Sequence, residues 1–181
     1  MAKESSSMKW NWLPSLCTMA NLGAGVLSLF YTIHEQYTTA FILIMVAALW
    51  DVLDGLLARL LHCSSDFGKQ LDSLADVVSF GVAPAFLTLF YQLGGTHWMG
   101  PLVAVLFVIC GAVRLARFNL MAFSTGFVGM PITAAGVILS FMFLWSEHLR
   151  PELLLGLMVV LSFLMISRIP FPSFKKKPIR R

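Results

Sequence analysis

Charged residues are scarce in this chain: only 12% of its 181 residues are Asp, Glu, Lys or Arg, whereas 58% are hydrophobic. Soluble domains carry about 25% charged residues, so this composition excludes an ordinary soluble domain. It predicts a protein that has the lipid bilayer as its solvent. We expect residues 1–181 to form a single membrane domain, with no room for a separate soluble domain and no nucleic-acid partner.

Cysteine is also rare, and the beginning of the chain lacks a long apolar run. Cys17, Cys63 and Cys110 lie far apart, so they match neither a disulfide framework nor a metal-binding pattern. We expect them to be plain buried residues. The stretch from Met1 to Lys9 is too polar to supply the apolar region of a signal peptide, so no cleaved leader is expected.

Six apolar segments fill most of the chain, and each is close to the length of about 20 residues that a membrane-spanning helix needs. Their approximate limits are 16–33, 38–62, 68–92, 98–118, 131–147 and 152–169. We predict an all-α membrane protein with six transmembrane helices. A short interfacial segment at 1–15, which contains Trp10 and Trp12, precedes them, and a basic tail at 170–181 follows.

The basic residues set the expected orientation. With six spans, both termini lie on the side that also holds the second–third and fourth–fifth loops. Of the 13 Lys and Arg residues, all but Arg150 lie on that side or in the adjoining helix ends. The positive-inside rule therefore places both termini in the cytoplasm, and the expected location is a prokaryotic cell membrane. The tail could be only a topology determinant, or it could bind anionic lipid at about 1 kcal/mol per cation.

Acidic residues concentrate in one window, Asp51 to Asp76, whose pattern is D-x2-D-G-x2-A-R-x8-G-x3-D-x3-D. At 100° per residue, this pattern forms one stripe on the second segment and another on the third. The two stripes consist of Asp51, Asp54, Gly55 and Ala58, and of Gly68, Asp72 and Asp76. Two antiparallel helices joined by a short loop would bring them together as a cage of four carboxylates near the cytoplasmic end of the bilayer.

Such a cage is too costly to remain unpaired. One Asp at a helix centre costs about 2.5–3.5 kcal/mol on insertion scales, so four would cost about 10–14 kcal/mol. Arg59 offsets only one charge, and divalent cations are expected to offset the rest. Clustered oxygen ligands suit Mg²⁺, Mn²⁺ or Ca²⁺, and four Asp residues fit two bridged ions better than one. We expect two Mg²⁺ or Mn²⁺ ions per subunit.

A buried ion-pair network and a divalent-cation transporter are the alternatives to an enzyme. Neither needs two glycines and an arginine at fixed offsets, whereas Gly55 and Gly68 would let a bulky substrate approach the backbone. A transport path also needs polar groups in the far leaflet, where the segments are nearly all apolar. The pattern therefore favours an enzyme.

At every fixed position the acidic window matches the signature of the CDP-alcohol phosphatidyltransferase family, which the chain resembles. The resemblance implies a six-helix membrane fold, usually a homodimer, with a two-metal site that faces the cytoplasm. It implies that Asp76 is the base on the incoming alcohol and that the metals are held by Asp51, Asp54, Asp72 and Asp76.

The same resemblance implies a binding site for the donor, CDP-diacylglycerol. Gly55, Arg59 and Ser65 match positions that contact its CDP part, and Gly68 is expected beside them. Thr18 and Asn21, at the start of the first span, fall where related enzymes contact the nucleotide or the metal site.

Features outside the motif resemble the serine-transferring branch of the family, which implies L-serine as the acceptor. They are the runs 72–85, 114–119, 127–131 and 167–175, although Thr133 stands where a small residue or proline is typical. Arg114 and Arg117, three apart on one helix face, support an anionic acceptor because guanidinium groups bind carboxylates in bidentate fashion. Donor phosphate, the phosphate of glycerol 3-phosphate, and topology are the competing roles.

The expected reaction is a direct displacement. Asp76 takes the proton of the serine hydroxyl, which attacks the β-phosphorus in line and gives phosphatidylserine and CMP. Glycerol 3-phosphate or inositol phosphate remains an alternative acceptor, and ether-linked archaeal chains remain an alternative in the donor. The residues offer no Ser-His-Asp or Cys-His arrangement for a covalent route, because interfacial or loop positions are expected for His34, His62, His97 and His148.

Overall fold

The computed structural model describes residues 13–60, 65–92, 98–121 and 129–167, and every regular element in these ranges is a helix. The elements are α1 (Leu13–Ile33), α2 (Tyr37–Leu60), α3 (Asp66–Asp76), the π-helix η2 (Val77–Val82), α4 (Ala83–Gln92), α5 (Gly100–Met121), α6 (Ile132–Phe141), the 3₁₀-helix η3 (Met142–His148) and α7 (Pro151–Ile166). This confirms the all-α prediction. The residues up to 12 and the tail at 170–181 lie outside the described ranges, and positions 13–15 belong to α1.

Four helical stretches are long and apolar enough to cross a membrane: Pro14–Ile33, Tyr37–Leu60, Asp66–Tyr91 and Gly100–Leu120. Two further apolar helices, Ile132–Trp145 and Pro151–Ile166, are shorter. The outward faces carry large exposed side chains such as Phe30, Leu49 and Phe163, which a lipid environment accommodates. The chain is therefore an all-helical integral membrane protein.

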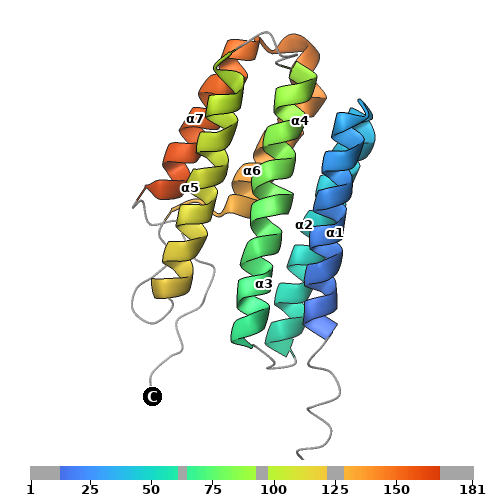
Figure 1. Cartoon of the computed structure of the whole chain (residues 1–181), viewed down its shortest axis with the longest axis vertical. Helices are drawn as coiled ribbons and strands as arrows, with labels where there is room; N and C mark the ends of the chain where they lie inside the picture. Colours follow the sequence, from blue (N-terminus) through green and yellow to red (C-terminus); the bar gives the residue numbers. More distant parts are fainter. Residues whose placement is uncertain (1–12, 61–64, 93–97, 122–128, 168–181) are drawn as a thin grey trace, which may run out of the picture.

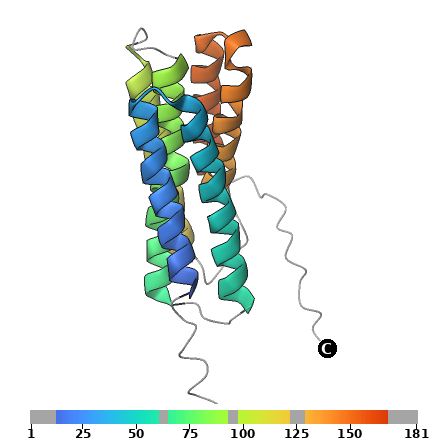
Figure 2. The ribbon, with the colours of Figure 1, turned by 90° about the vertical axis from the view of Figure 1, so that its right-hand side faces the viewer.

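The helices form an upright bundle in which successive rods alternate in direction (Figure 1). A short turn joins α1 to α2, with Glu35 in the left-handed region at φ 61°. The rod made of α3, η2 and α4 packs against α1, while α5 packs on α7. Figure 2 shows the start of α1, the end of α2 and the start of α3 at the same end of the bundle. We call this the carboxylate end, because Asp51 and Asp72 lie in the helices that meet there.

The two shorter rods cover only part of the bundle. In Figure 1, α6 begins and α7 ends well short of the carboxylate end. The α6 helix packs against η2 and α4. Its buried residues Ile132 and Leu139 join the hydrophobic core that also contains Phe80 and Ile44. Cys17 and Cys110 are buried and free, as expected, whereas Cys63 lies outside the described residues.

Close helix packing holds η2 between α1 and α6. Gly25 on α1 faces Ser79, and Gly136 on α6 lies against the backbone of Phe80, so a Cβ at either glycine would overlap its neighbour. The Ser79 Oγ also donates a hydrogen bond of 3.1 Å to the carbonyl of Asn21. These contacts fix the residues that directly follow Asp76 in the sequence.

Enlarging Gly136 tests this packing. Gly136→Ala should lower the free energy of unfolding by about 1–3 kcal/mol, because the new methyl group meets the Phe80 backbone rather than a side chain that could move away. Thermal unfolding of the detergent-purified protein measures the effect. Gly156→Ala on α7 is the control, since nothing lies within 4 Å of its added Cβ. Equal melting temperatures for the two variants would contradict the close approach.

Candidate active site

Three aspartates from two helices converge at the carboxylate end. One carboxylate oxygen each of Asp51 on α2 and of Asp72 and Asp76 on α3 lie within 4.8 Å of one another. Asp76 is only 7% exposed, and the other two are half-buried. The Oδ1 atoms of Asp72 and Asp76 are buried without a hydrogen-bond partner among the described residues. Buried oxygens of this kind need a positive partner.

The arrangement fits a hard divalent cation. Two oxygens that bind one Mg²⁺ at about 2.1 Å lie at most about 4.2 Å apart, so small side-chain rotations would bring the three carboxylates onto one ion. Among the described residues, the ion pair in the structure joins Lys69 to Asp66 at 3.0 Å and involves none of these three carboxylates. The cluster therefore has the donor atoms for such an ion and more negative charge than the nearby Arg114 offsets.

Asp54, the fourth predicted ligand, is buried and lies close enough to Asp72 and Asp76 to interact with both electrostatically. Its Oδ2 lies 3.0 Å from the hydroxyl of Thr18 on α1. The Thr18 hydroxyl is also 3.0 Å from the carbonyl of Pro14, and its single proton serves one of these acceptors. Thr18 thus lies at the carboxylates through a contact with Asp54, while the contact with the donor that the family resemblance implied stays a prediction.

Asn21 also faces the cluster. It is fully buried, it lies beside Asp76, and neither polar atom of its side chain has a well-formed hydrogen bond to a described residue. Burying an amide without partners costs free energy, so this position suits a polar ligand.

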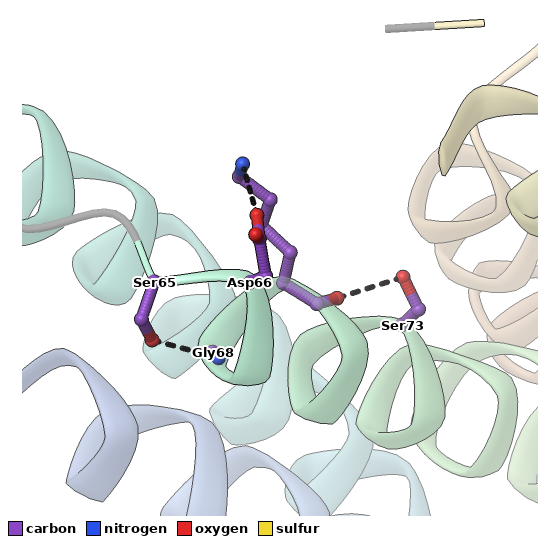
Figure 3. A network of polar contacts seen from close by, with 5 residues as sticks. Ser65, Asp66, Gly68 and Ser73 are labelled. Carbon is purple, nitrogen blue, oxygen red and sulfur yellow. Dashed lines mark hydrogen bonds and ion pairs between the residues drawn. The ribbon is translucent and has the colours of Figure 1, made fainter. Parts of the chain in front are cut away.

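The predicted donor-binding residues at the α2–α3 junction lie at the same end but are not gathered onto the carboxylates. Arg59 is exposed, and its Nε donates a hydrogen bond of 2.7 Å to the carbonyl of Gly55. Ser65 caps α3, since its Oγ accepts a hydrogen bond of 2.9 Å from the amide of Gly68 (Figure 3). A Cβ on Gly68 would lie 3.1 Å from that Oγ, which explains a small residue at this position.

The two predicted acceptor-binding arginines have different surroundings. Arg114 on α5 is 8% exposed, interacts electrostatically with Asp76 and has an Nε without a hydrogen-bond partner among the described residues. Arg117, one turn later, is exposed. The structure therefore brings Arg114 to the carboxylates but leaves Arg117 on the surface, so the pair does not converge on one anion here.

Two contacts of the site did not follow from the sequence. The Thr133 side chain, on α6, interacts with the carboxylate of Asp51. The Asn119 side chain, on α5, donates a hydrogen bond of 3.0 Å to the Oγ of Ser73, the residue after Asp72. The available signal was a polar residue within a mainly apolar segment, which did not say what each residue would face.

A bundle of membrane helices with buried carboxylates from two adjacent helices defines an integral membrane protein with a candidate metal site. The family model of the CDP-alcohol phosphatidyltransferases matches residues 11–167 of the chain. The chain belongs to the CDP-alcohol phosphatidyltransferase family.

Curated relatives match over most of the chain. It is 41% identical over 172 residues to a CDP-diacylglycerol–serine O-phosphatidyltransferase of Helicobacter pylori, covering 90% of this chain and 73% of that protein. It is 39% identical over 170 residues to the protein of the same name from Bacillus subtilis, covering 92% and 93%. It is also 39% identical over 166 residues to an archaetidylserine synthase of Methanothermobacter thermautotrophicus, covering 88% and 69%.

Metal binding can be measured without any substrate. Asp72→Asn should weaken Mn²⁺ binding to the purified protein by at least about tenfold, because the neutral amide replaces a charged oxygen ligand. Electron paramagnetic resonance of free Mn²⁺ gives the dissociation constant. Asp66→Asn is the matched control, since Asp66 is an exposed carboxylate on the same helix and is already paired with Lys69. If both variants bound Mn²⁺ like the parent protein, the cluster would not be the metal site.

Proposed function

We propose that the chain transfers a phosphatidyl group from CDP-diacylglycerol to the hydroxyl of L-serine, giving phosphatidylserine and CMP. The observation that carries the proposal is the convergence of Asp51, Asp72 and Asp76 in a chain of this family. The names of the relatives from H. pylori and B. subtilis, which match about nine tenths of the chain, supply serine as the acceptor.

Asp76 is the proposed base. It is the most deeply buried of the three converging carboxylates, and one of its oxygens has no partner among the described residues. When serine attacks, its hydroxyl proton moves to that carboxylate as the new oxygen–phosphorus bond forms, and the bond to CMP breaks. A direct displacement therefore needs no covalent intermediate on the protein.

The metal site consists of the three converging carboxylates together with Asp54, and it would hold two Mg²⁺ or Mn²⁺ ions per subunit. Bound ions of this kind neutralise the diphosphate of the donor and the charge of departing CMP. The Thr18 hydroxyl orients Asp54 when it donates its proton to the Asp54 Oδ2 rather than to the Pro14 carbonyl. The neutral hydroxyl of Thr133 supports Asp51 without adding charge.

The donor lies with its acyl chains in lipid and its CDP group over the carboxylates. The unsatisfied amide of Asn21 supports this placement, because it offers both a donor and an acceptor to a polar ligand. The other proposed contacts come from the α2–α3 junction, namely Gly55, Arg59, Ser65 and Gly68. Arg59, which lies on the surface in this structure, would turn from the Gly55 carbonyl toward the ligand.

Arg114 is the proposed partner of the serine carboxylate. It is buried, lies near the proposed base and has an unsatisfied Nε. Arg117 was predicted to share this role, but its exposure supports a weaker contribution, at the membrane surface or to a phosphate group.

The proposed topology has six spans, with both termini and the active site in the cytoplasm of a cell membrane. In this proposal, residues 1–181 form one membrane domain with an interfacial N-terminus and a basic tail. Two such chains assemble as a homodimer. The alternating direction of the rods and the position of the basic residues support the orientation. The shorter apolar helices at 132–145 and 151–166 are the fifth and sixth spans of this proposal.

An acceptor panel tests the reaction. Purified protein with CDP-diacylglycerol and Mn²⁺ should convert serine to phosphatidylserine and leave glycerol 3-phosphate and inositol phosphate unused, while Asp76→Asn should abolish transfer. The lipid products are separated by chromatography and identified by mass spectrometry. A parallel arm offers the ether-linked donor, because the archaeal relative is named for archaetidylserine. Transfer to another acceptor in preference to serine would contradict the proposal.

Arginine-to-lysine variants test the acceptor site. Arg114→Lys should raise the KM for serine by more than about tenfold and leave the KM for CDP-diacylglycerol nearly unchanged, because losing one arm of a buried clamp costs about 2–5 kcal/mol. Arg117→Lys is the control on the exposed side of the same helix, and neither KM should change, because lysine keeps the positive charge that a surface or phosphate contact needs. If the donor constant rose instead in Arg114→Lys, this arginine would bind the donor phosphates.

A further inference from the structure

A side-chain hydrogen bond with no assigned role joins α3 to α5, close to the last residue of each helix. The side-chain amide of Asn119 donates to the Oγ of Ser73 at 3.0 Å, and both residues are half-buried. The Ser73 hydroxyl donates in turn to the carbonyl of Lys69 at 3.0 Å, which fixes its own orientation (Figure 3). The Asn119 amide therefore meets an oxygen that is already held in place.

Among the described residues, α3 and α5 make few other contacts with each other. The α5 helix packs mainly on α7 and η2, whereas α3 packs mainly on α1 and η2. Beside Asn119, the side chains of Arg117 and Leu120 are exposed, Leu120 at 83%. A hydrogen bond of this kind contributes about 0.5–1.5 kcal/mol to holding the two helices together.

This hydrogen bond is close to the proposed reaction centre along both helices. Ser73 precedes Asp76 by three residues, or about 4.5 Å of helix, and Asn119 follows Arg114 by five residues, or about 7.5 Å. The two helices run in opposite directions (Figure 1), so both steps lead from the Arg114–Asp76 pair toward the carboxylate end. The hydrogen bond thus lies within about two helical turns of Arg114 and Asp76, on the side of the carboxylate end.

We propose that Asn119, through its hydrogen bond to Ser73, is a positioning residue that holds the end of α5 against α3 and so sets the separation of Arg114 and Asp76. This inference rests on the proposed serine transfer, in which Arg114 binds the acceptor and Asp76 takes its proton. A clamp and a base that must act on one small molecule need a fixed separation. Asn119 itself touches no substrate in this account.

A double-mutant cycle measures the link. Asn119→Ala and Ser73→Ala should each raise the KM for serine by about threefold to tenfold and leave that for CDP-diacylglycerol unchanged. The double variant should be no worse than the more impaired single variant, because both changes remove the same bond. Ser73→Thr keeps the hydroxyl and should restore the parent constant.

Ser162→Ala on α7 is the matched control, since its buried hydroxyl bonds only to the Met158 carbonyl of its own helix among the contacts described. Its KM values should equal those of the parent protein. Additive effects in the double variant, an effect of Asn119→Ala without one of Ser73→Ala, or unchanged serine constants in both would overturn the proposal.

A distance measurement separates this inference from the proposed function. Spin labels at Leu74→Cys and Leu120→Cys, which are exposed on α3 and α5, report the helix separation without substrate or metal. Cys63→Ser removes a competing thiol, while Cys17 and Cys110 are buried. Asn119→Ala should broaden the distance distribution, and an unchanged distribution would overturn the proposal. If the parent protein made no phosphatidylserine, the proposed function would be wrong. The distance measurement would still test whether the Asn119–Ser73 hydrogen bond holds α5 against α3.

Discussion

Carboxylates buried between membrane helices have to be neutralised, and the architecture of the carboxylate end follows from that requirement. An unpaired Asp in a membrane helix costs about 2.5–3.5 kcal/mol. Here Asp51, Asp72 and Asp76 bring oxygens within 4.8 Å of one another, and the nearby Arg114 supplies one positive charge. One guanidinium is too little for this charge, so divalent ions belong to the proposed working state.

The rest of the bundle holds these side chains at fixed positions. Directly after Asp76 the helix widens into the six-residue π-helix η2, in which Ser79, Phe80 and Gly81 are buried in succession. Helices of this type are rare and recur at functional sites. Here η2 is wedged between α1 and α6 by glycines that admit no Cβ, and this packing orients the aspartates of α3. Close packing in the membrane thus fixes the geometry of the polar site.

Much of the fold and the central carboxylates could be predicted from the sequence, because both depend on local periodicity. Apolar length indicated the helices, and steps of four residues placed Asp72 and Asp76 on one face. Periodicity gives the direction of a side chain but not its neighbour, so it did not distinguish buried Arg114 from exposed Arg117. The contact of Thr133 with Asp51 could not be predicted for the same reason, because it depends on where α6 packs.

The position of bound manganese tests the central claim most directly. Crystals of the full chain grown with Mn²⁺ and measured at the manganese absorption edge would locate the ions by anomalous scattering. Manganese density is expected between the carboxylates of Asp51, Asp72 and Asp76, and it should be lost in Asp72→Asn. Manganese bound elsewhere, or a cluster that stays empty at saturating Mn²⁺, would contradict the central claim.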